Sequence, residues 1–323
     1  MHSKYLQVAA AMTQMDGALR LDANESAVLA RELEHIEAVV TQALYPELRG
    51  REYVPMIAGV DPGAETFTWR RMDLRGYAEL IGNGAKDLPS VDIDLSESYR
   101  PIRSFGNQYG YTVQDLRNFA LAKARGSSIS LDSSLAQAAR MFIDRKGDDM
   151  IALGDSRVTN LTGFLNDANV PILTTSTLFG SWATRSPDQI LADMFAIEKK
   201  IIDQSVDIIQ PDSFLLPISQ YGIVSTTRLG TTTDTTILQF FLKNSQSVKQ
   251  VGKWNKLAAA GSGGVDRAVA YKRDPLIAGC IYPIIFQAQS PERRGFRWSI
   301  PCEGRSGGTV VRMPLGMVYA DGI

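Results

Sequence analysis

The sequence has few of the side chains that bind metals, form disulfides or transfer protons near neutral pH. Its 323 residues include two cysteines, Cys280 and Cys302, and two histidines, His2 and His35. Two cysteines are too few for a disulfide framework and favour a reducing compartment, and they could pair only if their Cα atoms lie close. We interpret His35 as a surface residue, because no second ligand is near it. We therefore expect no metal site and no organic cofactor.

The chain also lacks an excess of charge and a long hydrophobic run. Its 34 basic and 35 acidic residues give a formal net charge of −1, and no segment has the basic footprint of a dedicated nucleic-acid binder. No run approaches the ~20 apolar residues that span a bilayer, and residues 1–11 do not resemble a secretory signal. The composition, 44% hydrophobic and 21% charged, is typical of a globular protein made and used in a cytoplasm.

Sequence motifs for catalysis are missing as well. The chain has no GxSxG elbow, no HExxH, no paired CxxC and no Walker lysine. The glycine run 261–264 is not followed by Lys and Ser or Thr at P-loop spacing. We therefore predict no catalytic, cofactor-binding or metal-binding residues, although carboxylates distant in sequence could still converge in the fold.

The most informative stretch is a long helix predicted from Asp132 to Leu153, which at ~1.5 Å per residue would be roughly 33 Å long. Asp132 or Ser133 can cap its first turn, and Gly154 supplies a left-handed stop. Gly147 costs roughly 1 kcal/mol relative to alanine in a helix interior. Apolar residues recur at helical spacing and predict one buried face: Leu135, Ala138, Ala139, Phe142, Ile143, Met150 and Leu153.

Ahead of this helix the apolar period changes to two, from Thr66 to Leu95. Phe67 and Trp69 alternate with polar residues, and so do Val91, Ile93 and Leu95. Between the two runs lies a turn-rich tip, residues 82–89. The alternation predicts a two-stranded ribbon that is longer than most hairpins need. Because such a ribbon is marginal alone, it must lie on another surface.

Other patterns predict helices and strands along the rest of the chain. Residues 99–111 are aromatic, basic and glycine-rich, which suits either RNA stacking or, as we favour, a strand entering the core. Helices are predicted at 26–44, 113–124, 186–202, 218–229 and 236–243, and strands at 206–216, 280–286, 296–300, 309–313 and 317–319. Helices and strands in this order predict an α+β fold.

This order of elements, with two short motifs, resembles one protein family. The long helix ends in Leu153-Gly154-Asp155 and is followed by Leu161-Thr162-Gly163-Phe164-Leu165-Asn166. The last part of the chain carries Arg294-Gly295-Phe296, Ile300-Pro301-Cys302 and Ser306-Gly307-Gly308, then Arg312-Met313-Pro314 and Asp321-Gly322-Ile323. The pattern resembles the major capsid proteins of tailed bacteriophages, whose fold is named after phage Hong Kong 97.

The resemblance implies a phage capsid fold in five parts. Residues 1–50 would form an N-terminal arm and 51–110 an extension loop, a β-ribbon that lies on a neighbouring subunit. Residues 111–178 would form the peripheral domain with the long helix as its spine, and 179–276 the axial domain. Residues 277–323 would be C-terminal strands that return to the peripheral domain.

The function implied by the resemblance is structural. The chain would be a major capsid subunit that assembles as pentamers and hexamers into an icosahedral shell around double-stranded DNA. The alternative on the same fold is an encapsulin-type nanocompartment. Because the predicted arm helix begins near Ser26, a long N-terminal scaffolding domain is not expected, and a separate scaffolding protein, or assembly without one, is implied.

The resemblance also implies partners and contact residues. The partners would be other copies of the chain, portal, scaffolding and cement proteins, and packaged DNA bound without sequence specificity, with no membrane. The protein would reside in the virion and assemble in the host cytoplasm. Candidate residues for contact between subunits lie on the ribbon: Phe67, Trp69, Tyr77 and Lys86. Lys86 is also a possible donor for covalent cross-linking.

Overall fold

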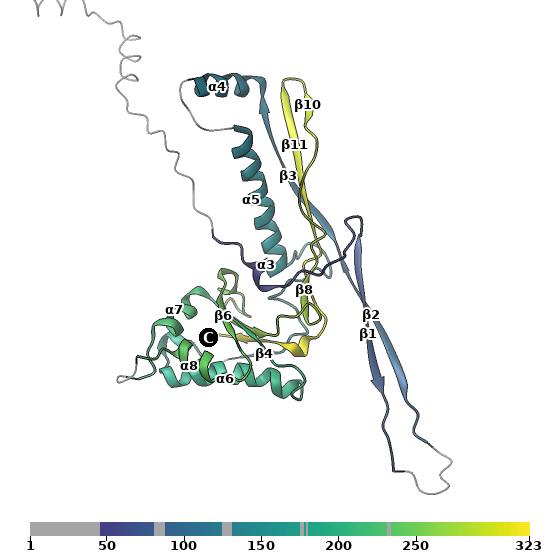
Figure 1. The fold of residues 1–323 in the computed structure, drawn as a ribbon, viewed down its shortest axis with the longest axis vertical. Helices are drawn as coiled ribbons and strands as arrows, with labels where there is room; N and C mark the ends of the chain where they lie inside the picture. The colour runs from purple at the N-terminus through teal and green to yellow at the C-terminus, as the bar shows by residue number, and fades with distance from the viewer. Residues whose placement is uncertain (1–45, 81–87, 125–130, 175–177, 179, 231–233) are drawn as a thin grey trace, which may run out of the picture. The chain divides into compact units, whose positions relative to one another are not determined.

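A computed structural model describes residues 46–323 except 81–87, 125–130, 175–177, 179 and 231–233. The chain divides into two units, Met1–Tyr45 with Leu121–Ile129, and Pro46–Ala120 with Ser130–Ile323. The architecture below concerns the second unit (Figure 1). The predicted helix at 26–44, His35 and Lys86 lie outside the described residues.

The centre of this unit is a five-stranded mixed sheet in the order β4-β13-β7-β5-β6. β13 pairs antiparallel with β7 and parallel with β4, and β5 pairs antiparallel with β7 and parallel with β6. The strands are β4 Ile172–Leu173, β5 Ser213–Leu216, β6 Gln250–Lys253, β7 Arg267–Tyr271 and β13 Met317–Asp321. Strands far apart in the sequence are therefore neighbours in one sheet.

Both faces of this sheet are buried, and alternate residues of each strand supply the two cores. On β13, Tyr319 packs into one core cluster with Phe164 and Trp254, whereas Val318 packs into the other with Met194. Side chains of a strand point alternately to opposite faces. A sheet covered on both sides gives the continuous apolar runs seen in these strands.

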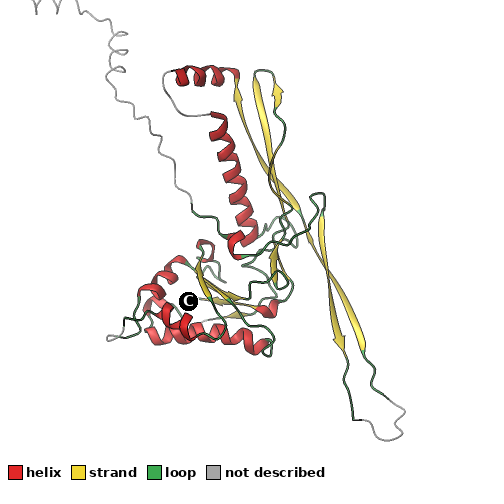
Figure 2. Cartoon of the chain, in the orientation of Figure 1, coloured by secondary structure: helices red, strands yellow, loops and turns green. Residues whose placement is uncertain are grey.

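Three helices cover the second face: α6 Pro187–Gln204, α7 Ile218–Thr226 and α8 Ile237–Asn244 (Figure 2). α6 and α8 both begin with a capping box, which satisfies free backbone N–H groups of the first turn. Ser186 and Gln189 cap α6, and Thr236 and Gln239 cap α8, each through two reciprocal hydrogen bonds. The predicted helices at 186–202, 218–229 and 236–243 are confirmed.

The predicted long helix is confirmed as α5, Leu131–Ala152, unbroken over 22 residues. Gly154, two residues after the end of the helix, has a φ of +72°, as a left-handed stop requires. Gly147 lies at the centre of the buried face. A Cβ atom placed there would be 1.9 Å from the hydroxyl of Tyr282, so the position needs glycine for close packing.

A second sheet packs along α5, in the order β10-β11-β3 with β9 also paired to β11 (Figure 1). Ala139 and Ile143 of the helix form a small core with Ile300 and Cys302 of β11. The strands are β3 Arg103–Thr112, β9 Ile284–Ala288, β10 Glu292–Arg294 and β11 Arg297–Ser306. The favoured interpretation of 99–111 as strand is confirmed, but these residues are divided between two strands, Asp92–Pro101 and β3, and β3 contributes only half-buried side chains to the small core. α4 follows at Val113–Ala124.

The strands of the segment 277–323 belong to more than one sheet. β9 to β11 pair beside β3, and β8 Ala278–Cys280 pairs with β12 Thr309–Val311. After η3 Pro314–Gly316, however, β13 joins the five-stranded sheet. The small helix α3, Gly50–Tyr53, packs against the end of α5, where the N–H of Gly50 donates to Asp148 Oδ1 at 2.6 Å.

Two details of the sequence prediction were wrong. Residues 206–212 are not strand, because Val206 and Asp207 have φ values of +51° and +61° and form a turn; β5 begins only at Ser213. Phe142 on α5 is 49% exposed, and Leu153, directly after the helix, is 44% exposed. The buried face is centred instead on Ile143, Gly147 and the 148–152 segment, because the β-sheet and Tyr282 approach the helix from that side.

Candidate assembly surface

The surface with the clearest functional character is the ribbon of β1 Thr66–Arg75 and β2 Asp92–Pro101. The two strands pair antiparallel over their full length, from Thr66 opposite Pro101 to Arg75 opposite Asp92. No other strand of the described residues pairs with either of them. The predicted two-stranded ribbon is thus confirmed for the residues on both sides of its tip.

One face of the distal half of this ribbon is apolar. Met72 lies opposite Leu95, and Leu74 lies opposite Ile93, so four large apolar side chains form two directly facing pairs. All four are exposed, between 52% and 72%. Cross-strand apolar pairs stabilise a ribbon, but here the outer surface of the pairs is left in water. We call these four residues the ribbon's apolar face.

The opposite face of the same half is charged. Arg71 forms an ion pair with Asp73 at 3.0 Å, and Arg75 forms one with Asp94 at 2.6 Å. These side chains alternate with the apolar ones along each strand, since the side-chain period of a strand is two. The distal ribbon is therefore amphipathic, with a polar face suited to water and an apolar face that is not.

The root of the ribbon differs from its distal half. Phe67 and Trp69, whose ring centroids are 6.2 Å apart, pack against a small core that contains Ile102, Ile281 and Val310. Both aromatic side chains are half-buried. The chain therefore covers the root of the ribbon with its own residues and leaves the distal half uncovered.

A buried arginine at the end of β2 anchors this root. Arg100 is 4% exposed and donates to the carbonyl oxygen of Asn160 at 3.2 Å and to the hydroxyl of Thr162, and it faces Asp167 at 3.5 Å. Burial lowers the pKa of the Arg100 guanidinium, opposed by the charge of Asp167. These contacts tie the ribbon to the loop that follows α5.

A cross-strand ion pair between Arg70 and Glu97 marks the boundary between the two halves of the ribbon. Arg70 donates to Glu97 across the strands at 2.8 Å, and this hydrogen bond raises the pKa of Arg70. Both side chains are largely exposed, so the pair adds little stability. It places one polar cross-strand pair between Tyr99 near the root and the apolar face beyond.

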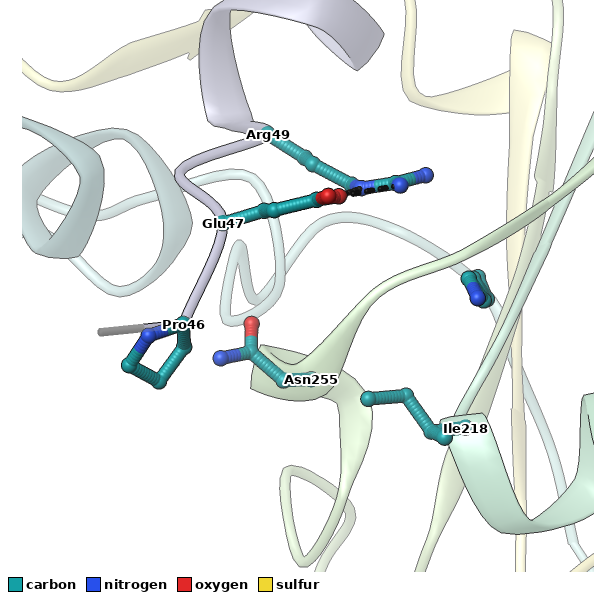
Figure 3. A pocket seen from close by; sticks show the side chains of 6 residues that line it. Pro46, Glu47, Arg49, Ile218 and Asn255 are labelled. Carbon is teal, nitrogen blue, oxygen red and sulfur yellow. Dashed lines mark hydrogen bonds and ion pairs between the residues drawn. The ribbon is translucent and has the colours of Figure 1, made fainter. Parts of the chain in front are cut away.

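An open pocket elsewhere in the unit offers no catalytic arrangement (Figure 3). Its lining residues are Pro46, Glu47, Arg49, Ile218, Lys253 and Asn255. Glu47 and Arg49 pair with each other, and the hydrogen bond and charge of Arg49 lower the pKa of the exposed Glu47. A carboxylate that is already paired with an arginine, in a lining without histidine, is poorly suited to general acid–base catalysis.

The described residues also contain no group of three or more potential metal ligands and no helix long and apolar enough to cross a membrane. Cys280 and Cys302 are both buried and free. Burial raises the pKa of Cys280 to about 12, so its thiol is not a reactive thiolate at neutral pH.

The family follows from a direct comparison of the sequence. A family model described as major capsid protein matches residues 76–323, which is more than half of the chain. The chain belongs to this family. Members of it are structural proteins of capsids, and the predicted resemblance to tailed-phage major capsid proteins is confirmed.

Solved structures confirm the capsid fold. The capsid of Myoviridae phage XM1 is similar with a TM-score of 0.79 at 17% identity, over 91% of this chain and 98% of that chain. The chain of Mycobacterium phage Bobi gives a TM-score of 0.63 at 14% identity, over 94% and 100%. A virus-like particle from Pyrococcus furiosus gives 0.55 at 10% identity, over 84% and 91%. No curated protein matches the chain.

The candidate contact residues of this capsid protein have different surroundings. Phe67 and Trp69 are half-buried against the chain's own core, Tyr77 is 66% exposed, and Lys86 lies outside the described residues. Sequence reasoning missed the ribbon's apolar face on β1. Met72 and Leu74 alternate with Arg71, Asp73 and Arg75, so the same two-residue period would have found it.

Proposed function

We propose that the chain is the head subunit of a tailed bacteriophage and assembles as pentamers and hexamers into an icosahedral shell that encloses double-stranded DNA. The observation that carries this proposal is the ribbon's apolar face. Four exposed apolar side chains lie on a two-stranded element that no third strand of the described residues supports. A monomer that remained alone in water would gain nothing from this arrangement.

A second copy of the same chain is the partner that the proposal requires. When the ribbon of one subunit rests on a different surface of the next, the contact is head-to-tail, and such contacts close into rings when the rotation permits. Pentamers and hexamers are rings of this kind. Because each subunit repeats the same contact, a modest free energy per contact accumulates over a closed shell.

The charge of the chain suits a container better than a nucleic-acid binder. A net charge of −1 gives no strong affinity for phosphates, and packaged DNA would be held without sequence specificity. Portal, scaffolding and cement proteins are the expected further partners, and assembly would take place in the host cytoplasm. We propose no catalytic role and no cofactor for the subunit.

Purified protein tests this proposal by electron microscopy and by a nucleic-acid assay of the particles. Closed icosahedral shells or ring-shaped capsomers are expected, and shells from infected cells should contain double-stranded DNA. A subunit that stays monomeric at high concentration under every assembly condition would contradict the proposal. Shells that hold protein cargo and no genome would favour the encapsulin-type alternative.

A further inference from the structure

A turn after α6 has an unusual backbone for its sequence. Val206 and Asp207 both have φ in the left-handed region, at +51° and +61°. A β-branched residue such as valine is a genuine outlier there, because its Cβ crowds the following carbonyl oxygen. Glycine or asparagine would adopt this turn more readily. The presence of valine therefore suggests that its side chain has a role.

Hydrogen bonds and packing fix this turn firmly. The N–H of Asp207 donates to the carbonyl oxygen of Ile202 at 2.9 Å, and the N–H of Ile208 donates to that of Ser205 at 3.1 Å. The hydroxyl of Ser205 accepts a hydrogen bond from the N–H of Ile209 at 3.1 Å. Ile209 itself packs against both core clusters. The turn is therefore anchored on its inner side.

The outer side of the turn presents two apolar side chains to solvent. Val206 is 82% and Ile208 81% exposed. Gln204, two residues earlier, donates to the carbonyl oxygen of Leu315 at 2.7 Å and so holds η3 beside the turn. Leu315 is half-exposed as well. A rigid turn that displays apolar residues next to another exposed apolar residue is a poor arrangement for a free surface.

A third segment extends this surface. The N–H of Met313 donates to the carbonyl oxygen of Ile277 at 3.3 Å, which brings Leu276 close to η3. Met313 and Leu276 are exposed. We use the name apolar corner for the five exposed residues on these three connected segments: Val206, Ile208, Leu276, Met313 and Leu315.

Charged residues of both signs border the apolar corner. Asp203 and Asp207 lie on the turn side, and Lys272 lies next to η3, where its N–H donates to the carbonyl oxygen of Gly316. A lipid surface or a nucleic acid would favour a basic rim. A mixed rim is suited to a surface that carries the same near-neutral balance of charges, as another copy of this chain does.

We propose that the apolar corner is a docking surface for a second copy of this chain, distinct in its residues from the ribbon's apolar face. The inference rests on the proposed function as a shell subunit, because it needs many copies packed side by side. When the apolar corner of one copy rests on a different surface of the next, the contact is head-to-tail, and such contacts close into rings when the rotation permits. Val206 and Ile208 are then held in place before assembly, so little conformational entropy is lost on docking.

Val206→Asn separates this role from a purely structural one. Asparagine tolerates the left-handed backbone, so the melting temperature of the unassembled subunit should rise by about 1–3 °C. The yield of closed shells should nevertheless fall at least about tenfold, the change that ~1.4 kcal/mol produces in each association constant. Ala259→Asn is the matched control, since Ala259 is exposed with a φ of +55° outside the apolar corner. It should leave assembly unchanged.

A labelling experiment gives a second readout that does not depend on yield. Both native cysteines are buried, so Ile208→Cys introduces a single exposed thiol. A maleimide should label this variant at least tenfold faster as the free subunit than within assembled particles. Equal labelling in both states, or wild-type assembly by Val206→Asn, would overturn the docking surface while wild-type shells still supported the proposed function. Failure of the wild-type chain to form shells would contradict both.

Discussion

The five-stranded sheet and the distal ribbon contain similar apolar residues, but those of the sheet are buried and those of the ribbon are exposed. In the sheet, alternate side chains of β13 and β7 enter two separate cores, and both faces are covered by the chain itself. In the ribbon, Met72, Leu74, Ile93 and Leu95 share one face, and that face remains exposed. An exposed apolar face that its own chain does not cover is typical of an interaction surface.

The root and the distal half of the ribbon differ in the same way, since only the root is covered by the chain itself. At the root, Phe67 and Trp69 pack on the chain's own small core, and Arg100 is buried among polar partners. Beyond the Arg70–Glu97 pair, the large apolar side chains of the ribbon are exposed. The root therefore fixes where the ribbon leaves the subunit, and the distal half stays exposed. The same pair of strands is covered by its own chain at one end and exposed at the other.

The largest effect on subunit stability is expected from a core truncation beside the five-stranded sheet. Phe164 is fully buried, and its ring packs edge-on against Tyr271 with centroids 4.9 Å apart. Phe164→Ala should lower the free energy of unfolding by about 3–5 kcal/mol. Leu74→Ala on the ribbon should change it by less than about 0.5 kcal/mol. Denaturant unfolding of unassembled subunits measures both, and equal losses would remove the contrast between the two regions.

Neighbouring residues of α5 give a finer version of the same contrast. Ile143 is 2% exposed in the core beneath β11, whereas the adjacent Phe142 is 49% exposed. Ile143→Ala should therefore cost about 2–4 kcal/mol, and Phe142→Ala about 1 kcal/mol or less. A larger loss for Phe142→Ala in the same unfolding experiment would mean that the buried face of α5 is assigned wrongly.

Local signals in the sequence were sufficient for most elements but not for the orientation of α5. Helical spacing located the helices at 186–202 and 236–243, and the apolar period of two located the ribbon. The helical stripe on α5 was too broad to separate Ile143 from Phe142. Gly147, which looked like a weak point of the helix, is required where Tyr282 packs against it. That contact joins residues far apart in sequence, so no local pattern contains it.

The strand predicted at 206–216 failed for a different reason. Its apolar content is real, but Val206 and Asp207 adopt left-handed backbone angles that local preference disfavours. Local hydrogen bonds between residues 202 and 209 and the packing of the half-buried Ile209 against both cores hold this turn. Of the four candidate contact residues, Phe67 and Trp69 serve the root of the ribbon, and the apolar face beyond them becomes evident only when the register pairs Met72 with Leu95.

A smaller, pH-dependent effect is expected where α3 meets α5. Burial raises the pKa of Asp148, opposed by its hydrogen bond from Gly50 and by the charge of Lys256. The favourable, protonated state contributes stability that is fully present below the ordinary carboxyl pKa and is lost as pH rises through the raised folded value. Asp148→Asn keeps an acceptor for Gly50 and should stabilise the subunit at neutral pH.

Asp149→Asn is the control for this pH dependence, because Asp149 pairs with Lys256 instead of being buried alone. That variant should not gain stability at neutral pH. Free energies of unfolding measured from pH 4 to 8 should show a weaker pH dependence for Asp148→Asn than for the wild type. Identical pH dependence of the free energy of unfolding for Asp148→Asn and the wild type would show that Asp148 is solvated in the folded subunit.

The smallest effect on the subunit, and the most direct test of the central claim, comes from paired substitutions on the two faces of the ribbon. Leu74→Ser with Ile93→Ser removes one facing pair from the apolar face. Asp73→Ser with Asp94→Ser changes the adjacent facing pair on the charged side and serves as the matched control. Both double variants should unfold within about 0.5 kcal/mol of the wild type, since all four positions are exposed.

Assembly should separate these two variants completely. Electron microscopy of the purified proteins is expected to show closed shells for the wild type and for Asp73→Ser with Asp94→Ser, and only subunits or open fragments for Leu74→Ser with Ile93→Ser. Closed shells at wild-type yield for the latter variant would contradict the assignment of the ribbon's apolar face as a contact between subunits.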